Sequence, residues 1–320
     1  MTADSTSPQN APAAHSGGGH GTKAILAALI ANLGIAVAKF AGFLITGSSS
    51  LLAEAGHSLA DTTNQGLLLL GGKQAKKDED EAHEFGYGSA RYFWSFVVAL
   101  ILFSLGSLFA IYEGISKLQH PHEVEKPWVA IGILGLAIAL EAYSFRTAIK
   151  ESIPLKGKQS WFSFIRTAKV PELPVLLLED SGALMGLVIA LGAIGLTLTT
   201  GNADFDAYGT LLIGVLLGVI AIILIIEMKS FLIGESASPQ AKQAIRTAIC
   251  SHPNVSRFIH ARTVHLGPED LLVTTKVEMD SALSFSEVAR TIDEIEARIR
   301  SAVPDARLIY VEPAEFDPTR

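Results

Sequence analysis

The sequence has almost no cysteine and little charge. Cys250 is the single cysteine among 320 residues, which excludes an intramolecular disulfide and a cysteine-based zinc cluster. Charged residues make up only 18% of the chain, and the net charge of -7 argues against a nucleic-acid partner. Residues 1–21 lack the basic start and apolar run of a signal peptide, so we expect a disordered tail there. Residues 317–320 are expected to form a short C-terminal tail.

What the sequence has in quantity is apolar residues, which account for 49% of the chain. They are gathered into six stretches, each long enough to cross a hydrocarbon core about 30 Å thick. We therefore predict an all-α transmembrane bundle over residues 22–233. Its six spans are expected at about 23–46, 50–74, 90–115, 127–149, 174–199 and 208–231.

Basic residues are distributed unevenly between these spans. The second and fourth connections are rich in lysine and arginine, whereas the first and fifth have none. The positive-inside rule then places the even-numbered connections and both termini in the cytoplasm. The sequence predicts an integral protein of the plasma (inner) membrane, with an organelle membrane as the alternative.

Polar residues inside the spans are the most informative feature. The second span contains Glu54, His57, Asp61 and Asn64, which share one side of a helix because residues three and four apart are neighbours on it. The fifth span contains adjacent acids, and further polar residues lie in the first and fourth. A charge at a helix centre costs roughly 2.5–3.5 kcal/mol on insertion scales and usually marks a cavity or a partner. Charged residues inside these other spans include Glu179 and Asp180 in the fifth, Glu141 in the fourth, and Lys39 in the first, which can snorkel and is expected to be an interfacial or pairing group.

His57, Asp61 and Asp180 together form a candidate metal site. An imidazole and a carboxylate four residues apart can point at one ion, and a carboxylate from a second helix completes a nitrogen and oxygen set suited to a divalent transition metal. The set closes only if the second and fifth spans touch. A His57–Asp61 pair alone could equally be a structural hydrogen bond.

Several motifs resemble those of the cation diffusion facilitator family of divalent metal/proton antiporters. The most specific are SSSLLAEAGHSLADTTNQ, with the family's H-x-x-x-D at His57 and Asp61, and HEFGYGSAR at 83–91. LLEDSGALMG and LIGESASP add weaker support, and the adjacent acids are similar to the branch that contains the mitochondrial zinc exporter. The resemblance implies His57, Asp61 and Asp180 as metal ligands, a homodimer in the lipid bilayer, and no prosthetic group.

The chain departs from the family pattern at Leu176, where many relatives have a histidine four residues before the aspartate. This leaves Glu179, Asn64, Glu54 or a water molecule as the fourth ligand, with Glu141 as a further candidate on the ion or proton path. Two carboxylates with one imidazole form a harder set than several histidines do. Zinc is the expected cargo, and manganese, iron, cobalt and cadmium are alternatives.

Two further regions are candidates for weaker metal binding. Asp80 and His83 in the second connection resemble a peripheral zinc site of bacterial relatives, but the third position is Tyr87, so a solvated acidic loop is the favoured interpretation. Residues 234–316 predict the order αββαβ, with a capping box at Ser284 and Glu287, which suits the family's cytoplasmic ferredoxin-like domain. We predict no high-affinity zinc cluster in that domain.

The function expected from the resemblance is export of divalent cations, zinc first, from the cytoplasm in exchange for protons by alternating access. The chain is then not an enzyme. Two alternatives use the same residues. One is an intramembrane metal-dependent hydrolase, although the chain has no H-E-x-x-H or G-x-S-x-G. The other is a receptor or scaffold in which transport is lost.

Overall fold

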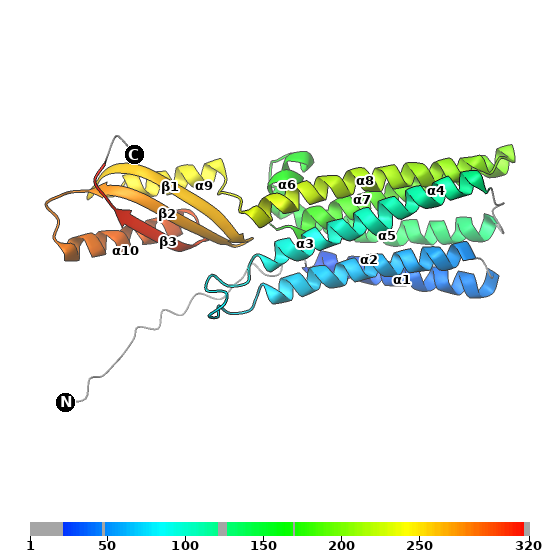
Figure 1. The fold of residues 1–320 in the computed structure, drawn as a ribbon, viewed down its shortest axis with the longest axis horizontal. Coiled ribbons are helices and arrows are strands. Elements are labelled where there is room, and N and C mark those ends of the chain that lie inside the picture. The colour runs from blue at the N-terminus through cyan, green and yellow to red at the C-terminus, as the bar shows by residue number, and fades with distance from the viewer. Residues whose placement is uncertain (1–21, 47–48, 121–126, 169, 317–320) are drawn as a thin grey trace, which may run out of the picture.

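The computed structural model describes residues 22–46, 49–120, 127–168 and 170–316, so both predicted tails lie outside the described residues. Within the described helices, the side chains at 42–43, 45–46, 49–57, 60 and 167 are not described. A bundle of long helices occupies one end of the molecule, and a small domain with a three-stranded sheet occupies the other (Figure 1).

The long helices agree with the predicted spans to within a few residues at most ends. Five are long and apolar enough to cross a membrane, and α2, with 26 residues, lies beside α1 in the bundle. The third span is one continuous rod, built from α3, the π-helical segment η1 and α4. The elements are α1 (Thr22–Thr46), α2 (Ser49–Gln74), α3 (Ala90–Ile101), η1 (Leu102–Leu108), α4 (Phe109–Gln119), α5 (Pro127–Lys156), α7 (Glu172–Thr200) and α8 (Asp204–Ile233).

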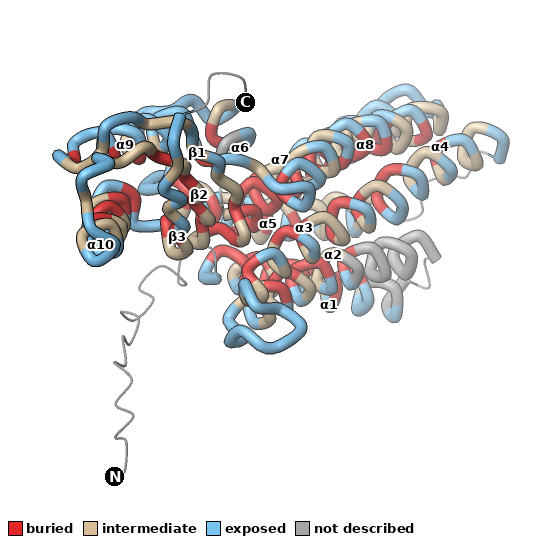
Figure 2. Tube along the Cα trace, turned by 60° about the vertical axis from the view of Figure 1, so that its left-hand side comes forward, coloured by how far each residue is buried: buried red, intermediate tan, exposed pale blue. Residues whose placement is uncertain are grey.

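These helices close a ring in which α1 packs on α2, α2 on α3, the α3–α4 rod on α8, α8 on α7, α7 on α5, and α5 on α1. Small residues permit the closest approaches. The Ser107 hydroxyl donates to the Gly214 carbonyl at 2.8 Å, and a Cβ at Gly214 would lie 2.9 Å from the Ile111 backbone nitrogen. Buried residues follow the inner faces of the helices (Figure 2).

The C-terminal domain has the predicted αββαβ order. It contains α9 (Pro239–Cys250), β1 (Val255–Gly267), β2 (Asp270–Met279), α10 (Phe285–Ala302) and β3 (Ala306–Pro313). β2 lies in the centre of the sheet, antiparallel to β1 and parallel to β3. The capping box at Ser284 and Glu287 is present, and the two helices pack on each other and on the sheet around a separate apolar core.

The two parts meet at the start of α3. Gly88 lies against the backbone of β1, where a Cβ added to this glycine would approach the Leu266 carbonyl oxygen to 2.9 Å. The Arg307 side chain reaches Asp270 at 2.9 Å and Glu79, in the loop between α2 and α3, at 3.4 Å. The same end of the bundle is linked internally by the buried pair of Arg91 in α3 and Glu172 in α7.

Candidate metal site

The second and fifth predicted spans, α2 and α7, touch through their polar side chains. The amide nitrogens of Asn64 and Gln65 donate to one carboxylate oxygen of Glu179, at 3.3 and 3.4 Å. All three side chains are buried in the bundle. The requirement that these two helices meet, on which the predicted ligand set depends, is therefore satisfied.

Asp180, the predicted α7 ligand, lies in the interior of the bundle with only 1% of its surface exposed. It accepts a hydrogen bond of 2.8 Å from the Ser144 hydroxyl of α5. Glu141 is also buried and lies three residues before Ser144, on the same face of α5. This face of α5 brings a further carboxylate toward the centre of the bundle.

Four carboxylates and one lysine interact electrostatically at this level of the bundle. Glu141 lies within Coulombic range of Asp61, Asp180 and Lys39. Glu179 lies within range of the same two aspartates and of Glu141. Of the two alternatives for Lys39, an interfacial or a pairing group, the structure supports pairing: the residue is 6% exposed and its ammonium donates to the Ser58 hydroxyl at 3.0 Å. A partner inside the bundle replaces the interfacial water that a snorkelling lysine would reach.

Two of the predicted residues cannot be placed as side chains. His57 and Glu54 belong to α2, but their side chains lie outside the described residues. The helical backbone puts residue 57 one turn from Asp61. Among the described residues, histidine, cysteine, aspartate and glutamate form no group of three that could hold a metal.

Leu176, the position where many relatives have a histidine, is fully buried in the apolar core of the bundle. It lies one turn before Asp180 on α7. Glu179 is turned by about 100° from Asp180 on the helix and reaches α2 through Asn64 and Gln65. The polar surface of α7 is therefore built from two adjacent acids.

Asn64, Gln65 and Glu179 form a polar layer between α2 and α7, and two side-chain oxygens of this layer have no hydrogen-bond partner among the described residues. Asn64 Oδ1 and Glu179 Oε2 are buried and accept no hydrogen bond from the residues that the structure describes. Leaving a buried acceptor unsatisfied costs about 1–3 kcal/mol, and more for a charged group. Such atoms in a native protein call for an explanation, for example a water or ion.

Asp80 and His83, the predicted peripheral pair, lie together in the exposed loop between α2 and α3. His83 Nδ1 is 3.3 Å from Asp80 Oδ1, and the Tyr87 hydroxyl donates to Asp80 Oδ2 at 2.6 Å. This hydrogen bond lowers the pKa of Asp80 and raises the pKa of Tyr87. Tyr87 thus occupies one carboxylate oxygen as a hydrogen-bond donor, which fits the interpretation as a solvated loop.

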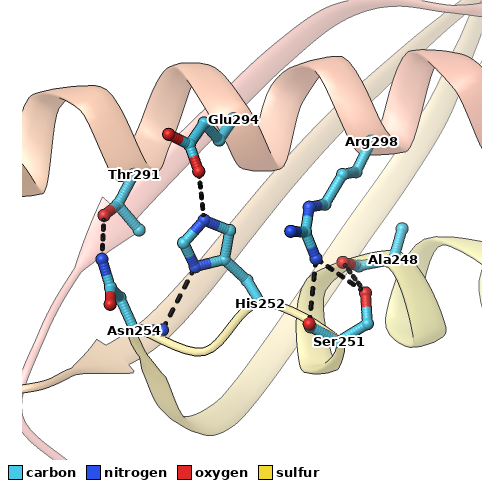
Figure 3. A network of polar contacts seen from close by, with 7 residues as sticks. All are labelled: Ala248, Ser251, His252, Asn254, Thr291, Glu294 and Arg298. Atoms are coloured by element: carbon cyan, nitrogen blue, oxygen red, sulfur yellow. Dashed lines mark hydrogen bonds and ion pairs between the residues drawn. The ribbon is translucent and has the colours of Figure 1, made fainter.

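His252 of the C-terminal domain is buried and has both ring nitrogens engaged (Figure 3). Its Nδ1 accepts from the Asn254 backbone N–H at 3.2 Å, so its Nε2–H donates to Glu294 at 2.8 Å. That hydrogen bond holds the pKa of Glu294 below its usual range. His252 joins the start of β1 to α10 and offers no free lone pair to a metal.

Asn32, Gln65 and Ser144 contribute to the polar interior without having been singled out as site residues from the sequence. Asn32 of α1 donates to Gln65 at 3.3 Å, which extends the chain of hydrogen bonds to a third helix. For two of these three residues, the position in the sequence could have indicated a place in the polar interior. Gln65 adjoins Asn64 in the polar stripe, and Ser144 lies one turn from Glu141.

Two family models match the chain, one for each part of the fold. The cation efflux transmembrane domain matches residues 25–233, and the cytoplasmic domain of cation efflux proteins matches residues 237–314. The first match ends at the last residue of α8, and the second begins just before α9.

Individual relatives are similar over different lengths. A protein named "Proton-coupled zinc antiporter SLC30A9, mitochondrial" from Mus musculus is 32% identical over 80% of this chain and 47% of its own length. "Magnetosome protein MamB" of Paramagnetospirillum magneticum is 25% identical over 85% of this chain and 87% of its own. A "Cadmium, cobalt and zinc/H(+)-K(+) antiporter" of Bacillus velezensis is 35% identical over 38% of this chain and 39% of its own. The chain spans about half the length of the mitochondrial relatives that it matches.

Proposed function

The chain belongs to the cation diffusion facilitator family of cation efflux proteins, and from that premise we propose that it exports divalent transition-metal cations in exchange for protons. Zinc is the first candidate for the cargo. Relatives named as zinc/proton and cadmium, cobalt and zinc antiporters support this proposal. Manganese and iron remain candidates because the set of ligands is rich in oxygen.

The observation that carries the proposal is the burial of Asp180 in an apolar bundle, at the level where α7 meets α2. A carboxylate in this position is costly unless it binds a cation, a proton or a hydrogen-bond donor. We assign the cation to His57, Asp61 and Asp180. Imidazole and carboxylate ligands must be deprotonated to bind metal, so protons and metal compete for the same atoms, and exchange follows from that competition.

The same proposal includes the arrangement of the protein in the membrane. We place residues 22–233 in the bilayer and residues 234–316 in the cytoplasm, with both termini on the cytoplasmic side of a plasma membrane. The loop rich in lysine after α2 and the C-terminal domain lie at the same end of the bundle (Figure 1), which supports this orientation. The match to a cytoplasmic efflux domain supports a homodimer as the working assembly.

The test is zinc flux in proteoliposomes driven by an imposed pH gradient. We expect the His57→Ala, Asp180→Ala double variant to carry zinc no faster than empty liposomes do. Glu113→Gln, a substitution in α4 away from the polar layer, is the matched control and should transport at the rate of the unmodified protein. A normal rate for the double variant would refute the assigned site. Zinc binding without flux in the unmodified protein would favour a receptor.

The same preparation gives the order of cargoes. Flux of zinc, manganese, iron, cobalt and cadmium would be compared at equal free concentrations. A site with one imidazole and two carboxylates should carry manganese at a measurable rate beside zinc, because oxygen ligands suit manganese. A preparation that carries zinc and cadmium only would show that the oxygens of α7 do not set the selectivity.

A further inference from the structure

A chain of hydrogen bonds crosses three helices on one side of the proposed ligands. Asn32 of α1 donates to Gln65 of α2, and Gln65 and Asn64 both donate to the same oxygen of Glu179 on α7. All four side chains are at least nine-tenths buried. These hydrogen bonds fix the orientation of the Glu179 and Asn64 side chains.

Each amide nitrogen in this series of hydrogen bonds has an acceptor, and two oxygens are left over. Both amide groups of α2 point their nitrogens at Glu179 Oε1, so Glu179 Oε2 and Asn64 Oδ1 remain without a partner among the described residues. Two buried oxygens with lone pairs attract a positive or hydrogen-bond-donating ligand, and they repel an anion. A cation is thus one kind of ligand that these two oxygens can accept, and a water molecule is the other.

These oxygens lie toward the cytoplasmic end of the bundle, relative to Asp61 and Asp180. Asn64 is three residues closer than Asp61 to the end of α2 at Gln74, which corresponds to about 4.5 Å along the helix axis. On α7, Glu179 precedes Asp180 and is nearer to the Glu172 end. Both of these helix ends face the C-terminal domain (Figure 1).

We propose that Asn64 and Glu179 form a second cation position, which receives a divalent cation of oxygen-preferring character on the cytoplasmic side of the His57, Asp61 and Asp180 site. This inference rests on the proposed function. One carboxylate and one amide oxygen are the kind of ligands that manganese and magnesium accept, with water completing the coordination shell. Two divalent cations this close repel each other, so occupancy of one position lowers the affinity of the other.

The second position has a consequence for selectivity. A cation that enters from the cytoplasm meets the oxygen ligands of the second position first, and the imidazole of His57 afterwards. The oxygen position does not favour soft cations, so discrimination in favour of zinc or cadmium is left to His57. Weak binding at the second position is compatible with transport, because the cation must leave this position to reach His57, Asp61 and Asp180.

Manganese binding to the full-length protein in detergent tests the proposal. Electron paramagnetic resonance measures the concentration of free manganese, from which the bound amount follows. All measurements use a protein that carries Asp180→Asn, which disables the His57, Asp61 and Asp180 site. If the Asp180→Asn protein does not fold, His57→Ala is used in its place. We expect manganese binding to persist in this background. Adding Glu179→Gln or Asn64→Leu should weaken it by about tenfold or more, while Glu113→Gln leaves it unchanged. Adding Asn64→Asp should tighten it, because another carboxylate enters the coordination shell.

Two results would overturn the second position. One is loss of all manganese binding in the Asp180→Asn background, and the other is equal binding by the Glu179→Gln and Glu113→Gln proteins. The latter result would leave the two oxygens with only a water or a proton. Failure of the proposed function would look different. Zinc affinity of the Asp180→Asn protein would then equal that of the unmodified chain, whatever manganese does.

Discussion

The guanidinium of Arg91 and the carboxylate of Glu172 form a two-pronged ion pair between α3 and α7. Arg91 Nη2 donates at 2.8 Å, Nε donates to the other oxygen, and the two side chains are only 14% and 3% exposed. Arg91 is the last residue of the HEFGYGSAR motif. The motif thus supplies the cation that neutralises the first acid of α7.

Removing this arginine should destabilise the membrane bundle. Arg91→Ala leaves Glu172 buried without its partner, and breaking a buried pair in this way costs about 3–5 kcal/mol. Thermal unfolding in detergent would measure the change. Arg146→Ala, which removes an exposed arginine of α5, is the control and should melt within about a degree or two of the unmodified protein. Equal melting temperatures for both variants would show that the pair is solvated.

At the level of single residues, the sequence predicted which spans carry polar residues, but not the contacts that these residues make. Helix spacing was sufficient to put His57 and Asp61 on one side of the second span, whereas the contact between the second and fifth spans was a condition that the sequence left open. The partners of Glu179 and the inward direction of Lys39 depend on how each helix is rotated about its axis. Rotation is set by packing against all neighbours, and a pattern in one span does not contain that information.

Helix packing in the bundle depends on glycines at the contact between α4 and α8. A methyl group at Gly214 would meet the backbone of Ile111, which cannot move aside as a flexible side chain can. We expect Gly214→Ala to lower stability by about 1–3 kcal/mol, as overpacking does. Gly192→Ala on α7, where a Cβ meets nothing within 4 Å, should be neutral or stabilising by up to about 1 kcal/mol. Melting temperatures of the two variants in the same detergent provide the comparison.

The boundaries of elements were predictable where local chemistry marks them. The Ser284 capping box opens α10, as the sequence indicated, and Ser238 likewise accepts from the Ala241 backbone nitrogen at the start of α9. The long helices followed from the length of the apolar runs. The π-helical segment η1 has no such marker in the sequence; its residue Ser107 donates a hydrogen bond to Gly214 of α8.

At the scale of the whole molecule, the side chain of Arg307 links the C-terminal domain to the membrane bundle, and this link can be tested. It joins β3 of the C-terminal domain to Asp270 of β2 and to Glu79 in the loop before α3. An exposed pair contributes only about 0–1 kcal/mol to stability, so its effect should be local. We expect Arg307→Ala to increase amide hydrogen exchange in residues 79–89 of the full-length protein. Arg300→Ala, which breaks an exposed pair within α10, should leave that loop unchanged. Equal exchange in both variants would show that the loop is held by other contacts.

The meeting of Gly88 and Gly267 also limits how such proteins can be recombined. A Cβ at either glycine would come within 3.0 Å of backbone atoms on the other side. A chimera that joins this membrane bundle to the C-terminal domain of a relative therefore needs a glycine at both positions, or the two backbones must separate. Gene fusions that exchange one of the two domains should therefore succeed only where the incoming domain also has a glycine at its position.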